Sequence, residues 1–363
     1  MRVDCIPGDR LIDARTTVAV DGRPTNRSDV LVRAVRITND DEAPARITGI
    51  SFTACAGDKA LRTIAYAPVR IVERAGEIVP LLEPFAKVPD NERAYFGTTG
   101  FWDPDGFAAT CDLRRGASIG FMLEHLVVLS DEPVDRIVVA AAFARDGTPD
   151  SASIDVPVAE HRSPNEYAFP VRGAWRVINN WDDVHGHRDS ISQEFAIDLV
   201  QPGADGLLPL DAANEDYAFY GCDVRAAADG VVVVVKDFCP ENPRAGARAE
   251  IDAKAVYREH GLKAVTAGNY VIVEHAGGEC SFYAHLIRGS IPVREGDRVT
   301  RGDVLGALGN SGNSDAPHLH FHVMAGADLG ARGLPCRFVD LVDTFGERCP
   351  FITHNLATVR THD

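Results

Sequence analysis

Three histidines at alternate positions near the C-terminus constrain what this chain can fold into more than any other feature. The run is Pro317-His318-Leu319-His320-Phe321-His322-Val323. Side chains alternate across a β-strand, so the three imidazoles share one face and the apolar residues share the other. A metal ion can take the lone pair of one buried imidazole while its neighbours handle protons. The run therefore predicts a strand that carries a metal or catalytic site on one face.

Two further residues offer compatible chemistry. Asp198 closes the apolar run Phe195-Ala-Ile-Asp, and a carboxylate oxygen beside imidazole nitrogen suits Zn²⁺. His285 lies in Tyr283-Ala-His-Leu, where Ala284 and Leu286 occupy the opposite face of the predicted strand. Taken alone, such an aspartate usually just ends a strand, and such a histidine is more often a hydrogen-bonded core residue than a catalyst.

The order of several motifs makes the C-terminal half, residues 172–345, resemble the lysostaphin-type zinc endopeptidases. The motifs are Gly268-Asn-Tyr-Val-Ile-Val-Glu-His, Tyr283-Ala-His-Leu, Val293-Arg-Glu-Gly-Asp-Arg-Val-Thr-Arg-Gly-Asp-Val-Leu-Gly-Ala-Leu-Gly-Asn-Ser-Gly-Asn-Ser and Pro317-His-Leu-His-Phe. The resemblance implies an antiparallel β fold of the lipoyl-like, duplicated hybrid motif type. It also implies Zn²⁺ as the cofactor and the peptide cross-links of bacterial peptidoglycan as the substrate.

The resemblance carries roles over to four residues. Asp198 matches the aspartate ligand of the metal, and His320, second in the H-x-H, matches a histidine ligand. His285 and His318 match the two catalytic histidines beside the attacking water. One of these two would act as general base, and the pair would orient the water and stabilise the oxyanion.

The third metal ligand is the point at which the chain departs from the family pattern. The family places a histidine four residues before the aspartate, where this chain has Glu194. Three alternatives stay open: a histidine of the upstream loop, with His187 preferred to His185 because it is nearer to Asp198; Glu194 itself; or loss of the ligand. Loss would make the domain a non-catalytic binding or regulatory homologue. A weaker alternative is a zinc hydrolase that acts on a non-peptide amide.

His322 is a further candidate for the metal site. It shares the predicted strand face of His320, so it could contact the metal or support the ligand.

The length of 363 residues favours two domains. We expect a mainly β chain: a β-sandwich-like domain of unknown function at 1–160, a polar linker at 161–171, and the peptidase-like domain at 172–363. Short alternating apolar runs, without long amphipathic helices, predict the sandwich. Strands are expected at 29–38, 47–53, 121–129 and 136–143, and a helix at 250–260 within an insertion at 237–265.

Charge and hydropathy exclude some partners. Lys and Arg number 37 against 53 Asp and Glu, and the net charge of −16 argues against a nucleic-acid partner. No apolar run approaches the ~18–20 residues of a membrane span. The first residues lack the features of a secretory signal, which favours the cytoplasm, whereas the family substrate implies the periplasm or the exterior. Eight well-separated cysteines favour mostly buried free thiols over the alternative of a disulfide framework. The oligomeric state stays open.

Overall fold

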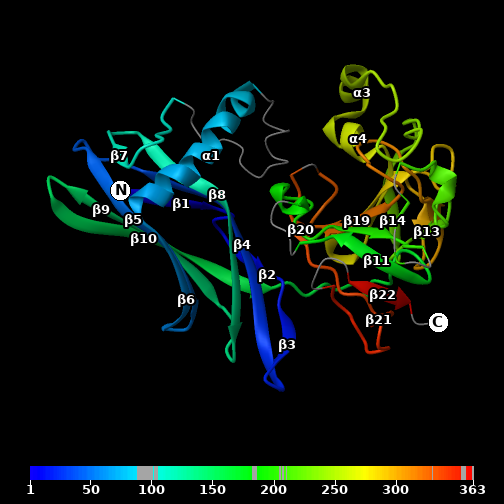
Figure 1. Cartoon of the computed structure of the whole chain (residues 1–363), viewed down its shortest axis with the longest axis horizontal. Coiled ribbons are helices and arrows are strands. Elements are labelled where there is room, and N and C mark those ends of the chain that lie inside the picture. The colour runs from blue at the N-terminus through cyan, green and yellow to red at the C-terminus, as the bar shows by residue number, and fades with distance from the viewer. Residues whose placement is uncertain are drawn as a thin grey trace. The chain divides into compact units, whose positions relative to one another are not determined.

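The chain divides into two compact units, Met1–His161 and Arg162–Asp363. The computed structural model describes residues 1–87, 101, 105–181, 186–203, 206, 208–209, 211–328, 330–352 and 357–361. Strands dominate both units, so the mainly β prediction is confirmed (Figure 1). Each unit is described by itself.

The first unit is one hydrogen-bonded network of ten strands. Its strands β4 and β8 pair antiparallel, as do β5 and β9, and the parallel pair β2–β10 joins these two groups. Buried side chains from both groups, such as Val32, Phe121, Phe52 and Val139, form one core, as in a sandwich. The strands are β1 (Arg2–Ile6), β2 (Leu11–Asp13), β3 (Thr16–Val20), β4 (Arg23–Thr38), β5 (Ala45–Ala56), β6 (Lys59–Tyr66), β7 (Asp112–Leu113), β8 (Ser118–Ser130), β9 (Arg136–Arg145) and β10 (Thr148–Glu160).

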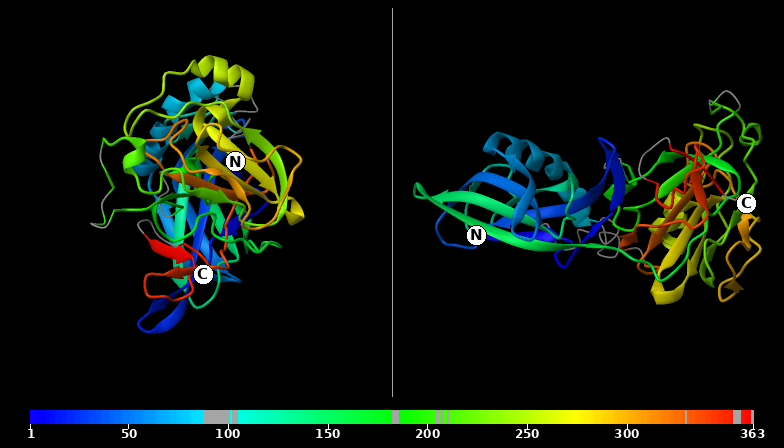
Figure 2. Two further views of the ribbon diagram at one scale, coloured as in Figure 1. Left: turned by 90° about the vertical axis from the view of Figure 1, so that its right-hand side faces the viewer. Right: turned by 90° about the horizontal axis from the view of Figure 1, so that it is seen from below.

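A long helix also belongs to this unit, so the expectation that it has none is wrong. Helix α1 (Pro68–Lys87) lies along the strands, and its residues Ile71, Ala75 and Ile78 join the core (Figure 2). These positions have helical spacing. Gly76 and Pro80 stand inside the same stretch, and such residues ordinarily argue against a helix interior.

The second unit holds a ten-stranded sheet and a separate two-stranded pair, β13–β18. Neighbouring strands of the large sheet follow the order β17-β14-β15-β16-β19-β12-β11-β22-β21, and β20 pairs with β19. Strands β16, β19 and β12 are therefore adjacent near its centre. The strands are β11 (Ala174–Asn179), β12 (Ile197–Val200), β13 (Asp223–Arg225), β14 (Gly230–Lys236), β15 (Asn269–Glu274), β16 (Cys280–Leu286), β17 (Arg298–Val299), β18 (Val304–Ala307), β19 (Leu319–Met324), β20 (Gly333–Leu334), β21 (Leu341–Asp343) and β22 (Thr358–Thr361).

Helical structure in the second unit is short. The helices are α3 (Ala253–His260) and α4 (Leu262–Ala267), with single 3₁₀ turns η2 (His187–Asp189), η3 (Asn214–Asp216) and η4 (Ala276–Gly278). Both α-helices fall in or beside the predicted insertion 237–265, and α3 matches the helix expected at 250–260.

The segment 161–171, predicted as a linker, contributes buried side chains to the second unit. Tyr167, Phe169 and Val171 are buried. The Tyr167 hydroxyl donates to Glu279 Oε2 at 2.7 Å, and this bond fastens the segment to the strand region. Most of the predicted linker is therefore packed against the unit that follows it.

The structure also bears on the cysteines and on membrane crossing. All eight cysteines are free thiols, and six of them are buried, as composition predicts. Among the residues that the structure describes, no helix combines the length and apolar character that a membrane crossing requires.

Candidate metal centre and active site

Asp198 and His320 face each other across two neighbouring strands. Strands β12 and β19 pair antiparallel with Asp198 directly opposite His320, so the two side chains project from the same face. The His320 Nδ1 atom lies 3.0 Å from Asp198 Oδ1. Both residues are at least nine-tenths buried.

The turn η2 brings a second histidine to the same carboxylate. His187 Nε2 lies 2.9 Å from Asp198 Oδ2, so each carboxylate oxygen has its own imidazole. One potential ligand atom from each of His187, Asp198 and His320 lies within 4.8 Å of the others. Ligand atoms bonded to one tetrahedral zinc at ~2.0–2.2 Å stand at similar separations. Two imidazole nitrogens and one carboxylate oxygen are also the ligand types that Zn²⁺ prefers, so this trio fits the metal.

Glu194, the other sequence candidate for the third ligand, lies elsewhere. It is buried, and its Oε1 atom is 3.5 Å from Nη2 of the fully buried Arg188. Within the described part of the chain, the group that could hold a metal includes His187 and excludes Glu194. His185 falls outside the described residues.

His318 stands beside the trio just before β19 begins. Its Nδ1 atom lies 2.8 Å from the carbonyl oxygen of Ala316 and 3.0 Å from Ser314 Oγ. A carbonyl only accepts, so Nδ1 carries the proton and Nε2 keeps its lone pair. This Nε2 lies 3.7 Å from Asp198 Oδ1.

His285 reaches the site because β16 contains a bulge. Asn269 pairs with Leu286 and Val271 with Tyr283, so two residues of β16 intervene where β15 has one. His285 itself has φ of 64°, a left-handed conformation that is unusual for a side chain of this size. Ala284 faces His320 across the sheet, so regular alternation would send His285 to the other face. Alternation alone therefore does not explain the position of His285.

The rings of His285 and His318 lie together as a result. Their centroids are 4.5 Å apart, and the His285 ring is 6.0 Å from that of His320. His285 Nδ1 donates to the carbonyl oxygen of Ser311 at 2.8 Å, which leaves Nε2 as the nitrogen with a lone pair. Both predicted catalytic histidines thus present the same tautomer.

His322 supports His320 from behind. Its Nδ1 atom lies 2.9 Å from His320 Nε2, the nitrogen that does not face Asp198. The His322 ring stacks on Phe282 with a centroid distance of 4.7 Å. The contact fixes the orientation of His320, as outer partners of metal-bound histidines commonly do.

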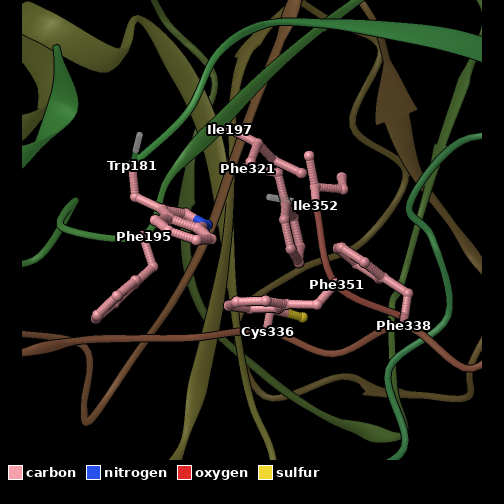
Figure 3. A pocket seen from close by; sticks show the side chains of 8 residues that line it. All are labelled: Trp181, Phe195, Ile197, Phe321, Cys336, Phe338, Phe351 and Ile352. Atoms are coloured by element: carbon pink, nitrogen blue, oxygen red, sulfur yellow. The ribbon is translucent and has the colours of Figure 1, made fainter. Parts of the chain in front are cut away.

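An apolar cluster underlies the site on the opposite face of β12 and β19. Ile197 and Phe321, which alternate with Asp198 and His320, point into it (Figure 3). Trp181 stacks on Phe351 there at 5.2 Å between ring centroids. The whole cluster consists of Trp181, Phe195, Ile197, Phe321, Cys336, Phe338, Phe351 and Ile352. This packing gives the strands that carry the polar groups a rigid base.

The electrostatics of the site favour the protonation states that a metal needs. Burial would raise the pKa of Asp198, but the neighbouring His187 and His318 and the imidazole hydrogen bonds hold it well below its ordinary value. Burial lowers the pKa of His320 to about 4. Burial also holds the pKa values of His285 and His322 well below 6.5. These shifts favour an ionised carboxylate and neutral imidazoles at the site.

Residues 310–314 contact both predicted catalytic histidines, and sequence reasoning did not single them out for this. This segment, called the 310–314 loop below, holds His285 through Ser311 and His318 through Ser314. The repeated Asn-Ser pairs of Gly309-Asn-Ser-Gly-Asn-Ser were a signal, because such residues hydrogen-bond readily in loops.

Comparison with known proteins identifies a family for part of the chain. Residues 215–330 match the model of peptidase family M23. The match includes His285, His318 and His320, and His187 and Asp198 precede it.

The relatives are cell-wall enzymes by name. Peptidoglycan DD-endopeptidase ShyC of Vibrio cholerae is 39% identical over 231 residues, which cover 61% of this chain and 42% of the relative. Peptidoglycan DD-endopeptidase ShyA of the same organism is 28% identical over 156 residues, covering 43% and 26%. The chain thus spans less than half the length of either relative. Among solved structures, the catalytic domain of lysostaphin from Staphylococcus simulans matches 38% of this chain and 73% of its own, with 20% identity and a TM-score of 0.23.

The resemblance inferred from the ordered motifs is therefore confirmed, and this chain carries a domain of peptidase family M23.

Proposed function

We propose that this protein is a zinc-dependent endopeptidase that cleaves peptide cross-links of peptidoglycan or a related peptide. The observation that carries the proposal is the convergence of His187, His320 and His318 on the single buried carboxylate of Asp198, with the ring of His285 beside that of His318. The substrate class is supported by the names of the relatives, which are peptidoglycan endopeptidases.

His187, Asp198 and His320 would hold the metal. A bound zinc ion supplies Lewis-acid chemistry, since it polarises a carbonyl group and lowers the pKa of water toward ~7. A set of three protein ligands would be the pattern of catalytic rather than structural zinc sites. His322 would keep His320 oriented for binding through Nδ1.

His285 and His318 would handle the protons. Each has its Nδ1 proton fixed by a backbone carbonyl, so each offers a basic Nε2. One of them can take the proton of the attacking water, and the protonated ring can then give a proton to the leaving amine. The other can donate to the oxyanion that forms on the scissile carbonyl once it carries a proton.

Hydrolysis of a defined cross-linked substrate tests the proposal. Zinc-loaded protein should convert purified cross-linked muropeptide dimers to monomers, with the new termini identified by mass spectrometry. Asp198→Ala should abolish the conversion, whereas Asp223→Ala, an exposed carboxylate on β13, should keep it. Bound zinc without turnover on any wall peptide would reject the substrate class. Absence of zinc binding and of turnover would favour a non-catalytic homologue.

A further inference from the structure

The two proposed catalytic histidines depend on the same short loop. The carbonyl oxygen of Ser311 accepts the Nδ1 proton of His285 at 2.8 Å. Ser314 Oγ lies 3.0 Å from Nδ1 of His318. Ser314 Oγ donates to the Ala316 carbonyl at 2.8 Å, and this carbonyl also accepts the Nδ1 proton of His318. The path of the 310–314 loop therefore fixes the Nδ1 proton of His285 directly and supports that of His318 through Ser314.

One buried side chain holds this loop in place. Asn242 is 2% exposed, and its Nδ2 lies 3.4 Å from Asn310 Oδ1, 3.1 Å from Gly312 O and 2.9 Å from Ser314 O. Its two N–H groups are thus shared among three acceptors that span the whole loop. Its Oδ1 accepts from the backbone N–H of Ala249 at 2.9 Å, which fixes the orientation of the amide.

Further hydrogen bonds make Asn242 the centre of a buried polar network. Asn214 Nδ2 donates to the backbone carbonyl oxygen of Asn242 at 2.7 Å, and Asn310 Nδ2 donates to Asn214 Oδ1 at 2.9 Å. The adjacent Glu241 accepts the backbone N–H of Asn310 through Oε2 at 2.7 Å. Asn242 belongs to the insertion 237–265, so this insertion anchors the loop from outside the strand framework.

We propose that Asn242 is a positioning residue for the reaction. Through the 310–314 loop it holds His285 and His318 in the Nδ1-protonated tautomer, so that both rings keep a basic Nε2 at the site. This inference rests on the proposed function, because it assigns Asn242 to the catalytic pair named there. Asn242 contacts none of the three proposed metal ligands in the described structure.

The chemistry of the amide explains why asparagine suits this position. An aspartate has the same shape but no N–H, so its oxygen would face the three acceptor oxygens of the loop without a donor. An alanine would leave the Gly312 and Ser314 carbonyls without this partner. Either change frees the loop to shift, and a shift of about 1 Å at a catalytic group can reduce the rate about 10²-fold.

Two substitutions with a matched control test the proposal on the full zinc-loaded chain. Asn242→Asp and Asn242→Ala should keep zinc content and KM close to wild type while kcat falls about ten- to hundredfold. Asn39→Asp is the control, because Asn39 is also fully buried and donates to two carbonyls, those of Ala43 and Leu113. The control should lower Tm yet leave kcat per folded molecule unchanged. Equal kcat in wild type and both Asn242 variants would overturn the proposal.

A spectroscopic measurement separates this inference from the proposed function. Nitrogen-15 NMR of histidine-labelled protein reports the tautomer of each ring, with His285 and His318 assigned by deletion variants. We expect one Nδ1-protonated form for both rings in wild type and tautomer mixtures in the Asn242 variants. Unchanged tautomers in the variants would overturn the inference even if wild type hydrolyses peptides. Altered tautomers support it even if the substrate assignment fails. If the Asn242 variants do not fold, Asn214→Ala makes the same test, because it removes the partner of the Asn310 side chain and of the Asn242 backbone carbonyl.

Discussion

The guanidinium group of Arg188 donates a hydrogen bond of 2.9 Å from Nη1 to the carbonyl oxygen of Trp181. The bond joins Arg188, the residue after His187, to Trp181. The Nη2 atom of the same side chain lies 3.5 Å from Glu194 Oε1. Glu194, a candidate ligand on sequence grounds, is therefore placed to support the turn that presents His187. A role as metal ligand and a role as structural support lead to different expectations for substitution of Glu194.

Glu194→Gln should destabilise the fold more than it weakens zinc binding. The change removes the charge of one buried pair, Arg188 with Glu194, and breaking a buried pair typically costs about 3–5 kcal/mol. Zinc affinity should fall by no more than about tenfold, since the metal ligands are untouched. Urea unfolding and competition with a chromogenic chelator measure the two effects. Loss of zinc without loss of stability would make Glu194 a ligand.

His187→Ala should remove a metal ligand outright. We expect zinc affinity to fall by more than the ~10–100-fold that is typical of losing an outer partner of a ligand. The matched control is His125→Ala, because His125 also pairs with a buried aspartate, Asp29, at 2.7 Å, but in the first unit. That variant should retain wild-type zinc affinity. Retention of wild-type affinity in His187→Ala would place the third ligand elsewhere.

His285→Ala and His318→Ala should keep zinc and lose turnover. General acid–base groups contribute about 10²–10⁴-fold in rate, which corresponds to about 3–5 kcal/mol of transition-state stabilisation. His275→Ala is the control, because His275 is a buried histidine of the same unit that hydrogen-bonds Asp229 O and Ser281 Oγ. It should lower Tm and leave kcat unchanged. The opposite pattern, with stability lost and turnover kept at His285 and His318, would make them core residues.

The alternation of polar and apolar residues predicted the strands of the site, whereas the tertiary structure determined where some of its side chains lie. Alternation in 317–323 was enough to place His320 and His322 on one face, because β19 is regular. Alternation could not place His285, because its position depends on an extra residue in β16 and a positive φ. Sequence separation also said little about the third ligand. Both His187 and Glu194 are near Asp198 in the chain, and only the fold shows that Glu194 contacts the buried Arg188 whereas His187 contacts Asp198.

The failure to predict helix α1 has a similar physical reason. Its core-facing residues Ile71, Ala75 and Ile78 repeat at helical spacing, but Gly76 and Pro80 weaken the local propensity. Packing of this face on the strands of the first unit outweighs that weakness, as tertiary contacts commonly do. The expectation of a first unit without long amphipathic helices is therefore wrong at this segment.

His322→Phe should weaken zinc binding although His322 is not among the proposed ligands. A phenyl ring can keep the stacking on Phe282 but offers no nitrogen to His320 Nε2. Loss of such an outer partner commonly reduces metal affinity about 10–100-fold. Chelator competition measures the change, and Tm shows whether the core tolerates the ring. Unchanged affinity would mean that β19 alone orients His320.

The same variant should change how the stability of the metal-free protein depends on pH. Burial holds the pKa of His322 well below 6.5, so the folded chain keeps this ring neutral while the unfolded chain binds a proton below about pH 6.5. The free energy of unfolding is therefore unaffected by this group above about pH 6.5. Below that pH, protonation of His322 in the unfolded chain lowers it, by up to about 1.4 kcal/mol per pH unit.

Other groups titrate in the same window, so the comparison with wild type is essential. His320, with a pKa of about 4, acts in the same direction as His322. Glu241, whose pKa burial raises to about 7, acts in the opposite direction, because the folded state binds its proton first as pH falls. Urea unfolding in chelator at several pH values from 7.5 to 5.0 should show the stability of His322→Phe gaining steadily on wild type as pH falls. A difference that stays constant over this range would mean that His322 has the same pKa in the folded and unfolded states.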